Sequence, residues 1–153
     1  MTLNNEGLLD AVNWKLLEAL QENARLSFKE LGQRVGLTSP AVTERVRRLE
    51  EAGIITGYNA EISAAKIGLS VRAFIRLSAL KMKAPIIGDF LKEIPEVFEC
   101  YRVTGVDTYI IMLCASSVEH LEEVIDHIAQ YGEPTTSIVL ATQLTRRVIK
   151  GVA

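Results

Sequence analysis

Residues 34–48 combine several side chains that are able to recognise DNA. Arginine donates two parallel hydrogen bonds to a guanine edge and also neutralises phosphate, while serine and threonine hydroxyls suit phosphates or bases. The stretch contains four arginines and one acidic residue, whereas the whole chain has a formal net charge of -2. The cluster is therefore a local basic patch and not part of a global attraction to nucleic acid. The candidate DNA-contacting residues are Arg34, Thr38, Ser39, Pro40, Thr43, Glu44, Arg45, Arg47 and Arg48.

The expected contacts differ with the side chain. Arg47 and Ser39, together with Thr43, would read or position bases, and the other arginines would neutralise phosphates. Glu44 could accept a hydrogen bond from cytosine N4, or could pair with Arg48 one turn along and orient it. A solvated helix face often carries the same residue types. The secondary structure that presents these side chains must therefore distinguish a DNA-binding face from an ordinary solvated helix face.

Helical signals surround the cluster. Apolar residues at helical spacing predict a first helix, which begins at Asp10 or Asn13. A capping box formed by Ser27 and Glu30 begins a second helix, because each side chain satisfies a free backbone N–H at the helix start. Gly36 then ends this short helix.

The third helix carries most of the candidate DNA contacts. Thr38 or Ser39 caps its start, Pro40 fits its first turn, and Gly53 ends it. Two helices joined by a tight turn and supported by another helix form a helix-turn-helix, whose recognition helix enters the major groove. We therefore predict that this face contacts double-stranded DNA.

Residues 57–67 are predicted to be a hinge between two domains. Tyr58, Ala60 and Ile62 alternate with their neighbours, so a short strand is expected there. The predicted domains are a helix-turn-helix domain over 1–56 and a second domain over 68–153.

Strand and helix signals alternate after residue 68. The order β-α-β-β-α-β is that of a ferredoxin-like fold. The fold class is α+β, with an N-terminal winged-type helix-turn-helix domain joined to a C-terminal ferredoxin-like βαββαβ domain. One face of such a sheet has no helices, and the apolar strands predict that a second copy covers it in an obligate dimer. Strands are expected over 71–77, 97–103, 109–114 and 136–144, with helices that begin near Pro85 and at the capping box of Ser116 to Glu119.

Composition excludes several classes of protein. The chain has 153 residues, of which 48% are hydrophobic and 24% charged, the balance of an ordinary globular protein. No apolar run reaches the roughly 18 residues of a membrane span, and no secretory signal is evident, so a cytoplasmic location is expected. Cys100 and Cys114 are expected to be buried and reduced. His120 and His127 have no companions at ligand spacing, so neither a metal nor another cofactor is expected.

The ordered set of motifs resembles the Lrp/AsnC (feast/famine) family of bacterial and archaeal transcription regulators. The resemblance covers nearly the whole chain, although no single motif carries it alone. The similar stretches are LDAVNWKLLEAL at 9–20, NARLS at 23–27, ELGQRVGLT at 30–38, VTERVRRLE at 42–50, GII at 53–55, GY at 57–58, VTG at 103–105 and TSIVL at 136–140.

The resemblance implies a C-terminal domain for effector binding and assembly, with dimers that associate into tetramers or octamers. In that family, amino acids or related small molecules bind between dimers, near the turn after the second strand of this domain. Here Asp107 stands one place earlier than the family's usual acid, whose position Thr108 occupies, and a simple hairpin turn is the other interpretation. The effector-binding residues implied for this chain are Thr104, Gly105, Asp107, Tyr109, Thr135 and Thr136.

The leading hypothesis is a sequence-specific DNA-binding transcriptional regulator, not an enzyme, whose assembly and DNA binding respond to an amino acid or related molecule. One alternative is an architectural DNA-wrapping protein without an effector. The other is an enzyme similar to the sirohaem decarboxylases that share this organisation, which the lack of a catalytic cluster disfavours. Arg146 and Arg147 either support DNA wrapping or form a solvated tail, and Trp14 is expected to be a packing contact.

Overall fold

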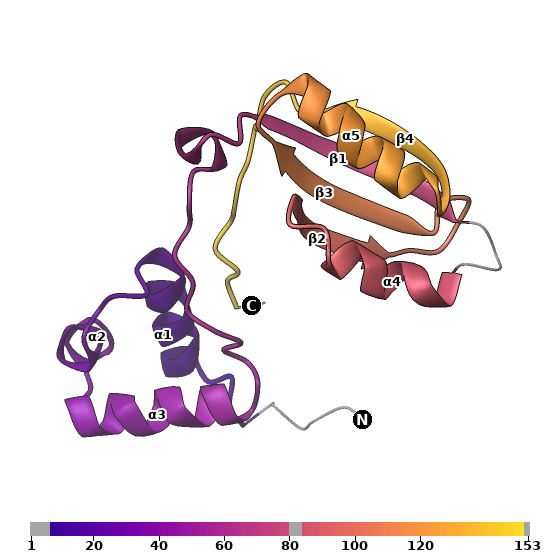
Figure 1. Cartoon of the computed structure of the whole chain (residues 1–153). Coiled ribbons are helices and arrows are strands. Elements are labelled where there is room, and N and C mark those ends of the chain that lie inside the picture. The colour runs from indigo at the N-terminus through magenta and orange to yellow at the C-terminus, as the bar shows by residue number, and fades with distance from the viewer. Residues whose placement is uncertain (1–6, 80–83, 152–153) are drawn as a thin grey trace. The chain divides into compact units, whose positions relative to one another are not determined.

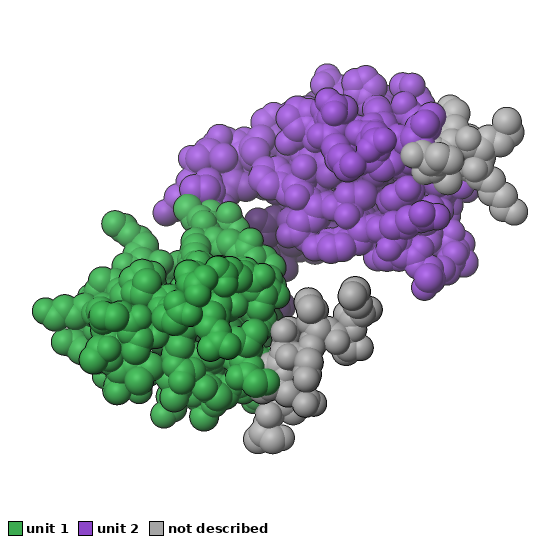
Figure 2. Space-filling view, turned by 90° about the horizontal axis from the view of Figure 1, so that it is seen from below, with its two compact units in different colours: residues 1–60, 144–153 green, residues 61–143 purple. Residues whose placement is uncertain are grey.

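The computed structural model describes residues 7–79 and 84–151. The chain forms two compact units, one comprising residues 1–60 together with 144–153 and the other residues 61–143 (Figure 2). Within the described residues, every helix is too short or too polar to cross a membrane.

Three helices form most of the first unit: α1 (Ala11–Glu22), α2 (Phe28–Val35) and α3 (Ser39–Glu51) (Figure 1). Asp10 is the N-cap of α1, since its Oδ1 accepts the Asn13 N–H at 2.7 Å. The capping box of α2 is confirmed, with Ser27 Oγ accepting the Glu30 N–H at 3.2 Å and the Glu30 carboxylate accepting the Ser27 N–H at 2.8 Å. Thr38 is the N-cap of α3 but forms no side-chain capping bond. The buried residues that join the helices are Leu16, Ala19, Leu20, Leu31, Val42 and Val46.

The turn between α2 and α3 depends on two glycines. Gly36 has φ 74°, the left-handed conformation that glycine adopts without strain. Gly32 accepts the Leu37 N–H at 2.9 Å through its carbonyl, and a Cβ on Gly32 would lie 2.4 Å from the Leu37 carbonyl oxygen. The absence of a side chain at Gly32 therefore allows the close approach that orients α3.

The segment after α3 differs from its prediction. The short strand predicted at 58–62 is wrong, because the described chain there forms no strand, and a 3-10 helix follows at Ala64–Ile67. Tyr58 instead donates its hydroxyl to the Glu50 carboxylate at 2.8 Å. Burial is the main cause that raises the pKa of Tyr58 to about 12, and the hydrogen bond to Glu50 is the second. This contact ties the start of the linker to α3.

The second unit is the expected βαββαβ fold. Its strands form one antiparallel sheet in the order β2-β3-β1-β4. The last strand begins four residues earlier than predicted, at Gly132, because glycine permits a close approach to β1: a Cβ there would lie 2.2 Å from the Ser78 carbonyl oxygen. Pro134 is tolerated because β4 is an edge strand. The elements are β1 (Val71–Ala79), α4 (Ala84–Lys92), β2 (Val97–Arg102), β3 (Tyr109–Ala115), α5 (Val118–Ala129) and β4 (Gly132–Ile138).

The two faces of the sheet differ. Helices α4 and α5 cover one face and bury a core that includes Ile75, Leu77 and Ile111 (Figure 1). On the other face Phe74 is 42% exposed, and it alternates along β1 with the core residues. Of the two cysteines, Cys114 is buried as predicted, but the expectation for Cys100 is wrong, because it lies exposed on β2.

The C-terminal segment returns to the first unit. The Gln21 side chain accepts the Ile149 N–H and donates to the Ile149 carbonyl, both at 2.9 Å. Gly151 packs against Trp14, where a Cβ would lie 3.0 Å from carbon atoms of the indole ring. Residues 144–151 therefore belong structurally with α1, and Trp14 contacts the chain's own C-terminal segment.

Candidate nucleic-acid interface

The outer face of α3, together with Arg34 on the last turn of α2, presents most of the predicted DNA-contacting side chains to solvent. Val42, Val46 and Leu49 are fully buried on the inner face and fix the rotation of the helix. Ser39 and Arg45 are half-buried at the flanks of α3. The predicted residues that lie exposed are Arg34, Thr38, Pro40, Thr43, Glu44, Arg47 and Arg48.

Arg47 is held between two carboxylates in the free protein. Its Nε and Nη2 donate to Glu44 at 3.0 and 2.7 Å, and its Nη1 donates to Glu51. The bond from Arg47 lowers the pKa of Glu44, and Glu44, followed by Glu51, raises the pKa of Arg47. Glu44 therefore pairs with Arg47, and the alternative pairing with Arg48 is not formed. Thr43 donates its hydroxyl to the Ser39 carbonyl at 2.9 Å, which leaves its oxygen able to accept.

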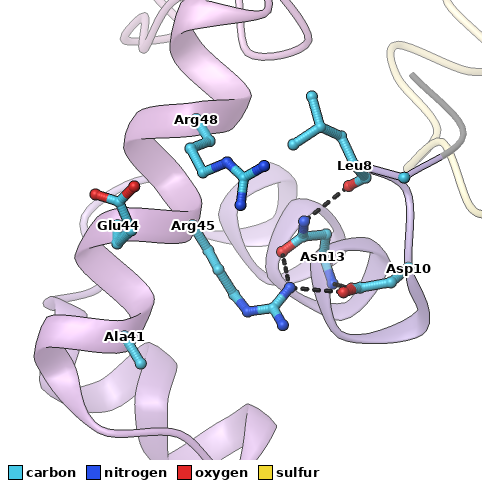
Figure 3. Close-up of a pocket in the computed structure, with 8 residues that line it drawn as sticks. Leu8, Asp10, Asn13, Ala41, Glu44, Arg45 and Arg48 are labelled. Carbon is cyan, nitrogen blue, oxygen red and sulfur yellow. Dashed lines mark hydrogen bonds and ion pairs between the residues drawn. The ribbon is translucent and has the colours of Figure 1, made fainter. Parts of the chain in front are cut away.

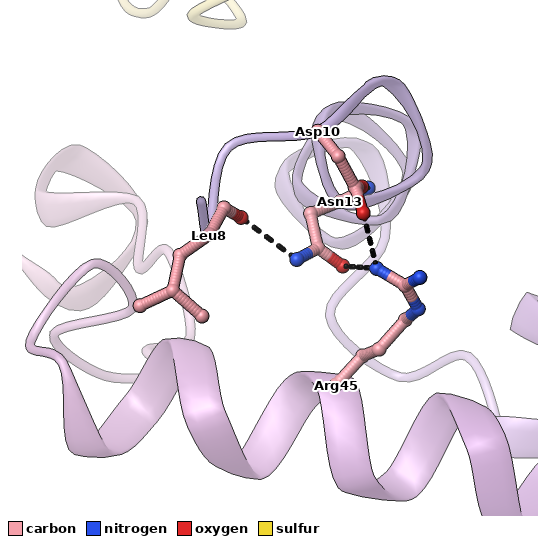
Figure 4. A network of polar contacts seen from close by, with 4 residues as sticks. All are labelled: Leu8, Asp10, Asn13 and Arg45. Atoms are coloured by element: carbon pink, nitrogen blue, oxygen red, sulfur yellow. Dashed lines mark hydrogen bonds and ion pairs between the residues drawn. The ribbon is translucent and has the colours of Figure 1, made fainter. Parts of the chain in front are cut away.

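Arg45 turns toward α1 (Figure 4). Its Nη1 donates to Asp10 Oδ2 at 2.7 Å and to Asn13 Oδ1 at 3.0 Å. Asn13 is only 3% exposed, and its side-chain amide also donates to the Leu8 carbonyl at 2.7 Å. Of the two predicted starts of the first helix, Asp10 is the N-cap, and Asn13 is a buried link between α1 and α3.

Arg48 projects from the same flank of α3 as Arg45, while Glu44 points to the other side (Figure 3). A cavity of about 320 Å³ lies between this flank and the start of α1. Within residues 7–79 and 84–151, Arg48 has no carboxylate within ion-pair distance. The lining residues are Gly7, Leu8, Asp10, Asn13, Ala41, Glu44, Arg45 and Arg48.

The basic patch is therefore largely neutralised by local ion pairs. Arg34 lies 3.7 Å from Glu22, in addition to the pairs already described for Arg45 and Arg47. These pairs are exposed or half-exposed, so each is weak and open to exchange with another anion. A count of the charged residues within 34–48 does not reveal these ion pairs, because Asp10, Glu22 and Glu51 lie outside that range.

The implied effector residues surround the turn between β2 and β3. Ser78 donates its hydroxyl to the Val106 carbonyl at 3.1 Å, and Thr108 Oγ1 accepts the Ala79 N–H at 3.2 Å, which fastens the turn to β1. Asp107 lies 3.9 Å from Arg76, a residue that the sequence reasoning missed because it reads as one polar position in an alternating strand. Thr104 and Gly105 are exposed at the tip of this turn.

The remaining implied residues divide between the two faces of the sheet. Thr135 is opposite Arg76 on β1, on the face without helices. Tyr109 is opposite Leu77 and is only 6% exposed within the core beneath the helices. Thr136 is opposite Ile75 and so faces that same side. The structure thus brings together Asp107, Arg76 and Thr135 but separates them from Tyr109.

Two family models match the chain in succession. A winged helix-turn-helix DNA-binding model matches residues 9–56, and an Lrp/AsnC ligand binding domain model matches residues 72–149. The uncharacterized HTH-type transcriptional regulator YezC of Bacillus subtilis is 40% identical over 134 residues, covering 88% of this chain and 95% of that protein. The HTH-type transcriptional regulator LrpC of the same organism is 32% identical over 87% of this chain and 92% of its own length.

Solved structures show the same architecture. That of B. subtilis LrpC has a TM-score of 0.86 at 31% identity, covering 90% of this chain and 99% of that one. A transcriptional regulator from Neisseria meningitidis, in complex with L-methionine, has a TM-score of 0.86 at 28% identity. The match covers 92% of this chain and 96% of that one. The feast or famine regulatory protein of M. tuberculosis, also complexed with L-methionine, has a TM-score of 0.83 at 30% identity. The match covers 92% of this chain and 99% of that one.

Proposed function

The chain belongs to the Lrp/AsnC family of transcriptional regulators, and from this premise we propose that the outer face of α3 reads a specific DNA sequence. The observation that carries this proposal is Arg47, exposed midway along a helix whose inner face is locked into the core. Arg47 would contact a guanine edge, and Ser39 and Thr43 would position phosphates or bases. Arg48 and Arg34 would neutralise phosphate, whereas Arg45 would act indirectly by fixing α3 against α1.

A selection experiment tests this proposal. Duplexes enriched by the protein from a random-sequence library are expected to share a pseudo-palindrome whose half-sites lie about one helical turn apart. Enrichment of no sequence, with general DNA binding retained, would favour the architectural alternative. The absence of any DNA binding would contradict the proposed function.

We further propose that the helix-free face of the sheet binds a second copy of the chain. Phe74 on this face is exposed, and Ile110 and Met112 beside it are half-buried, so a partner would bury apolar surface. The dimer would place two α3 helices in successive major grooves. Sedimentation of the wild type and Phe74→Glu tests this: the variant is expected to sediment as a monomer.

We also propose that an amino acid binds near the turn between β2 and β3. Arg76 could pair with its carboxylate, Asp107 with its ammonium group, and Thr135 with either through its hydroxyl. A thermal-shift screen of the twenty amino acids is expected to find a ligand that raises the melting temperature of the wild type but not of Asp107→Ala. We place this regulator in the cytoplasm and assign it no catalytic activity.

A further inference from the structure

Two carboxylates flank Arg47 on the outward face of α3, and we propose that Glu44 and Glu51 determine specificity by withholding Arg47 from DNA that offers only phosphates. This inference rests on the DNA binding proposed above and extends it to residues that oppose binding.

The two carboxylates engage all three nitrogens of the Arg47 guanidinium group, through three of its five N–H donors. Arg47 Nε and Nη2 donate to the two oxygens of Glu44, and Nη1 donates to Glu51. The acids lie three residues before and four residues after the arginine, so all three share one strip of the helix surface. All three are exposed on the side away from the buried core residues. A guanine edge that binds the fork of Nε and Nη2 must therefore displace Glu44, and one that takes the bound N–H of Nη1 must displace Glu51.

Non-specific DNA offers little in exchange for this displacement. The guanidinium fork fits a phosphate about as well as a carboxylate, so the exchange replaces one anion with another. The released Glu44 and Glu51 then face the negative field of the duplex. Non-specific affinity comes almost entirely from neutralised phosphates, so these two acids reduce that affinity directly.

A matching sequence offers more. Guanine O6 and N7 can accept from Arg47, and the N4 amino group of a nearby cytosine can donate to Glu44. The carboxylate that repels phosphate thus gains a hydrogen bond at the correct base pairs. Specificity is a difference between two affinities, and it increases when wrong sequences are penalised.

The neighbouring arginines do not mask this effect. Arg45 is paired with Asp10, and Arg34 lies near Glu22, so Arg48 is the one arginine around Arg47 without an ion pair among the described residues. Removal of one carboxylate at Glu51 is therefore a large relative change in the local charge.

The test is fluorescence anisotropy of the wild type and variants on a selected duplex and on its scrambled counterpart, over a salt series. We expect Glu51→Gln to tighten binding to the scrambled duplex about fivefold and to the selected duplex by less. Its plot of log affinity against log salt on the scrambled duplex should steepen by up to about 0.9. Glu122→Gln, an exposed site on α5, is the control with the same change in net charge.

A double-mutant cycle separates action through Arg47 from simple repulsion. In an Arg47→Ala background, Glu51→Gln is expected to lose most of its effect, because no arginine remains to be released. Equal tightening of both duplexes, no more tightening than in Glu122→Gln, or an unchanged effect without Arg47 would overturn the inference while leaving the proposed function intact. A wild type that binds neither duplex would overturn both.

Discussion

Arginines of the same patch have different roles, which only their partners reveal. Arg47 faces solvent between two acids, whereas Arg45 connects α3 to the cap of α1 through Asp10 and Asn13. The pairing of Arg47 with Glu44 and Glu51 follows helical spacing, but the same spacing equally allowed the expected pairing of Glu44 with Arg48. The link from Arg45 to Asp10 spans 35 residues, so no local pattern indicates it.

The Asp10 link predicts a pH-dependent contribution to stability. The Asn13 N–H, and then Arg45, lower the pKa of Asp10 below its ordinary 3.8. Because the folded-state pKa is the lower one, the contribution is complete above about pH 4 and is lost as pH falls through the folded-state pKa. We expect Asp10→Asn to lower the free energy of unfolding at pH 7 by about 0.5 kcal/mol, a small value because the pair is half-exposed and screened by solvent.

Thermal denaturation at pH 7 and pH 3 measures this contribution. The difference in melting temperature between the wild type and Asp10→Asn should be smaller at pH 3 than at pH 7. Asp126→Asn, an exposed change on α5, should show no comparable difference at pH 7. An equal difference in melting temperature at pH 7 and pH 3 would show that the charge of Asp10 is not the source of the stability contribution.

At the scale of elements, helix boundaries were predictable where the controlling residues are neighbours in sequence. The capping box of Ser27 and Glu30 is such a case, because its bonds span three residues. Gly132 and the start of β4 were not predictable, because the constraint is the Ser78 carbonyl on another strand. The implied effector residues Thr135 and Thr136 are divided between the two faces of the sheet because successive residues of a strand point to opposite faces.

Gly32 provides an element-scale prediction. An Ala side chain there would collide with the Leu37 carbonyl, so the α2–α3 turn must shift. We expect Gly32→Ala to destabilise the protein by about 1–3 kcal/mol in denaturant unfolding. Gly88→Ala in α4 is the control, because a Cβ there meets no atom within 4 Å and alanine favours helix. Similar effects from the two substitutions would contradict the close-approach explanation.

At the scale of the whole molecule, the chain passes between its two units twice, through the linker and again before residue 144. The second passage ends on α1, at Gln21 and Trp14. Arg146 and Arg147 are exposed on this segment. No composition signal predicts this attachment, because it depends on one amide and one indole at positions distant from the C-terminus.

The attachment can be measured through the single tryptophan of the chain. Gln21→Ala removes both side-chain bonds to Ile149 and should cost about 1 kcal/mol in stability. Detachment should also expose Trp14 and shift its emission to longer wavelength. Gln143→Ala, an exposed change near the same segment, should alter neither property. Unchanged emission in Gln21→Ala would show that the attachment of the C-terminal segment does not depend on the two Gln21 bonds.

The central claim is that α3 reads DNA sequence through Arg47, and anisotropy on the selected and scrambled duplexes tests it most directly. At one fixed, near-physiological salt concentration the wild type should bind the selected duplex at least about a thousandfold more tightly. Arg47→Ala should lose roughly tenfold to a hundredfold on that duplex and much less on the scrambled one. Equal binding to both duplexes at this salt concentration, unaffected by Arg47→Ala, would contradict the account.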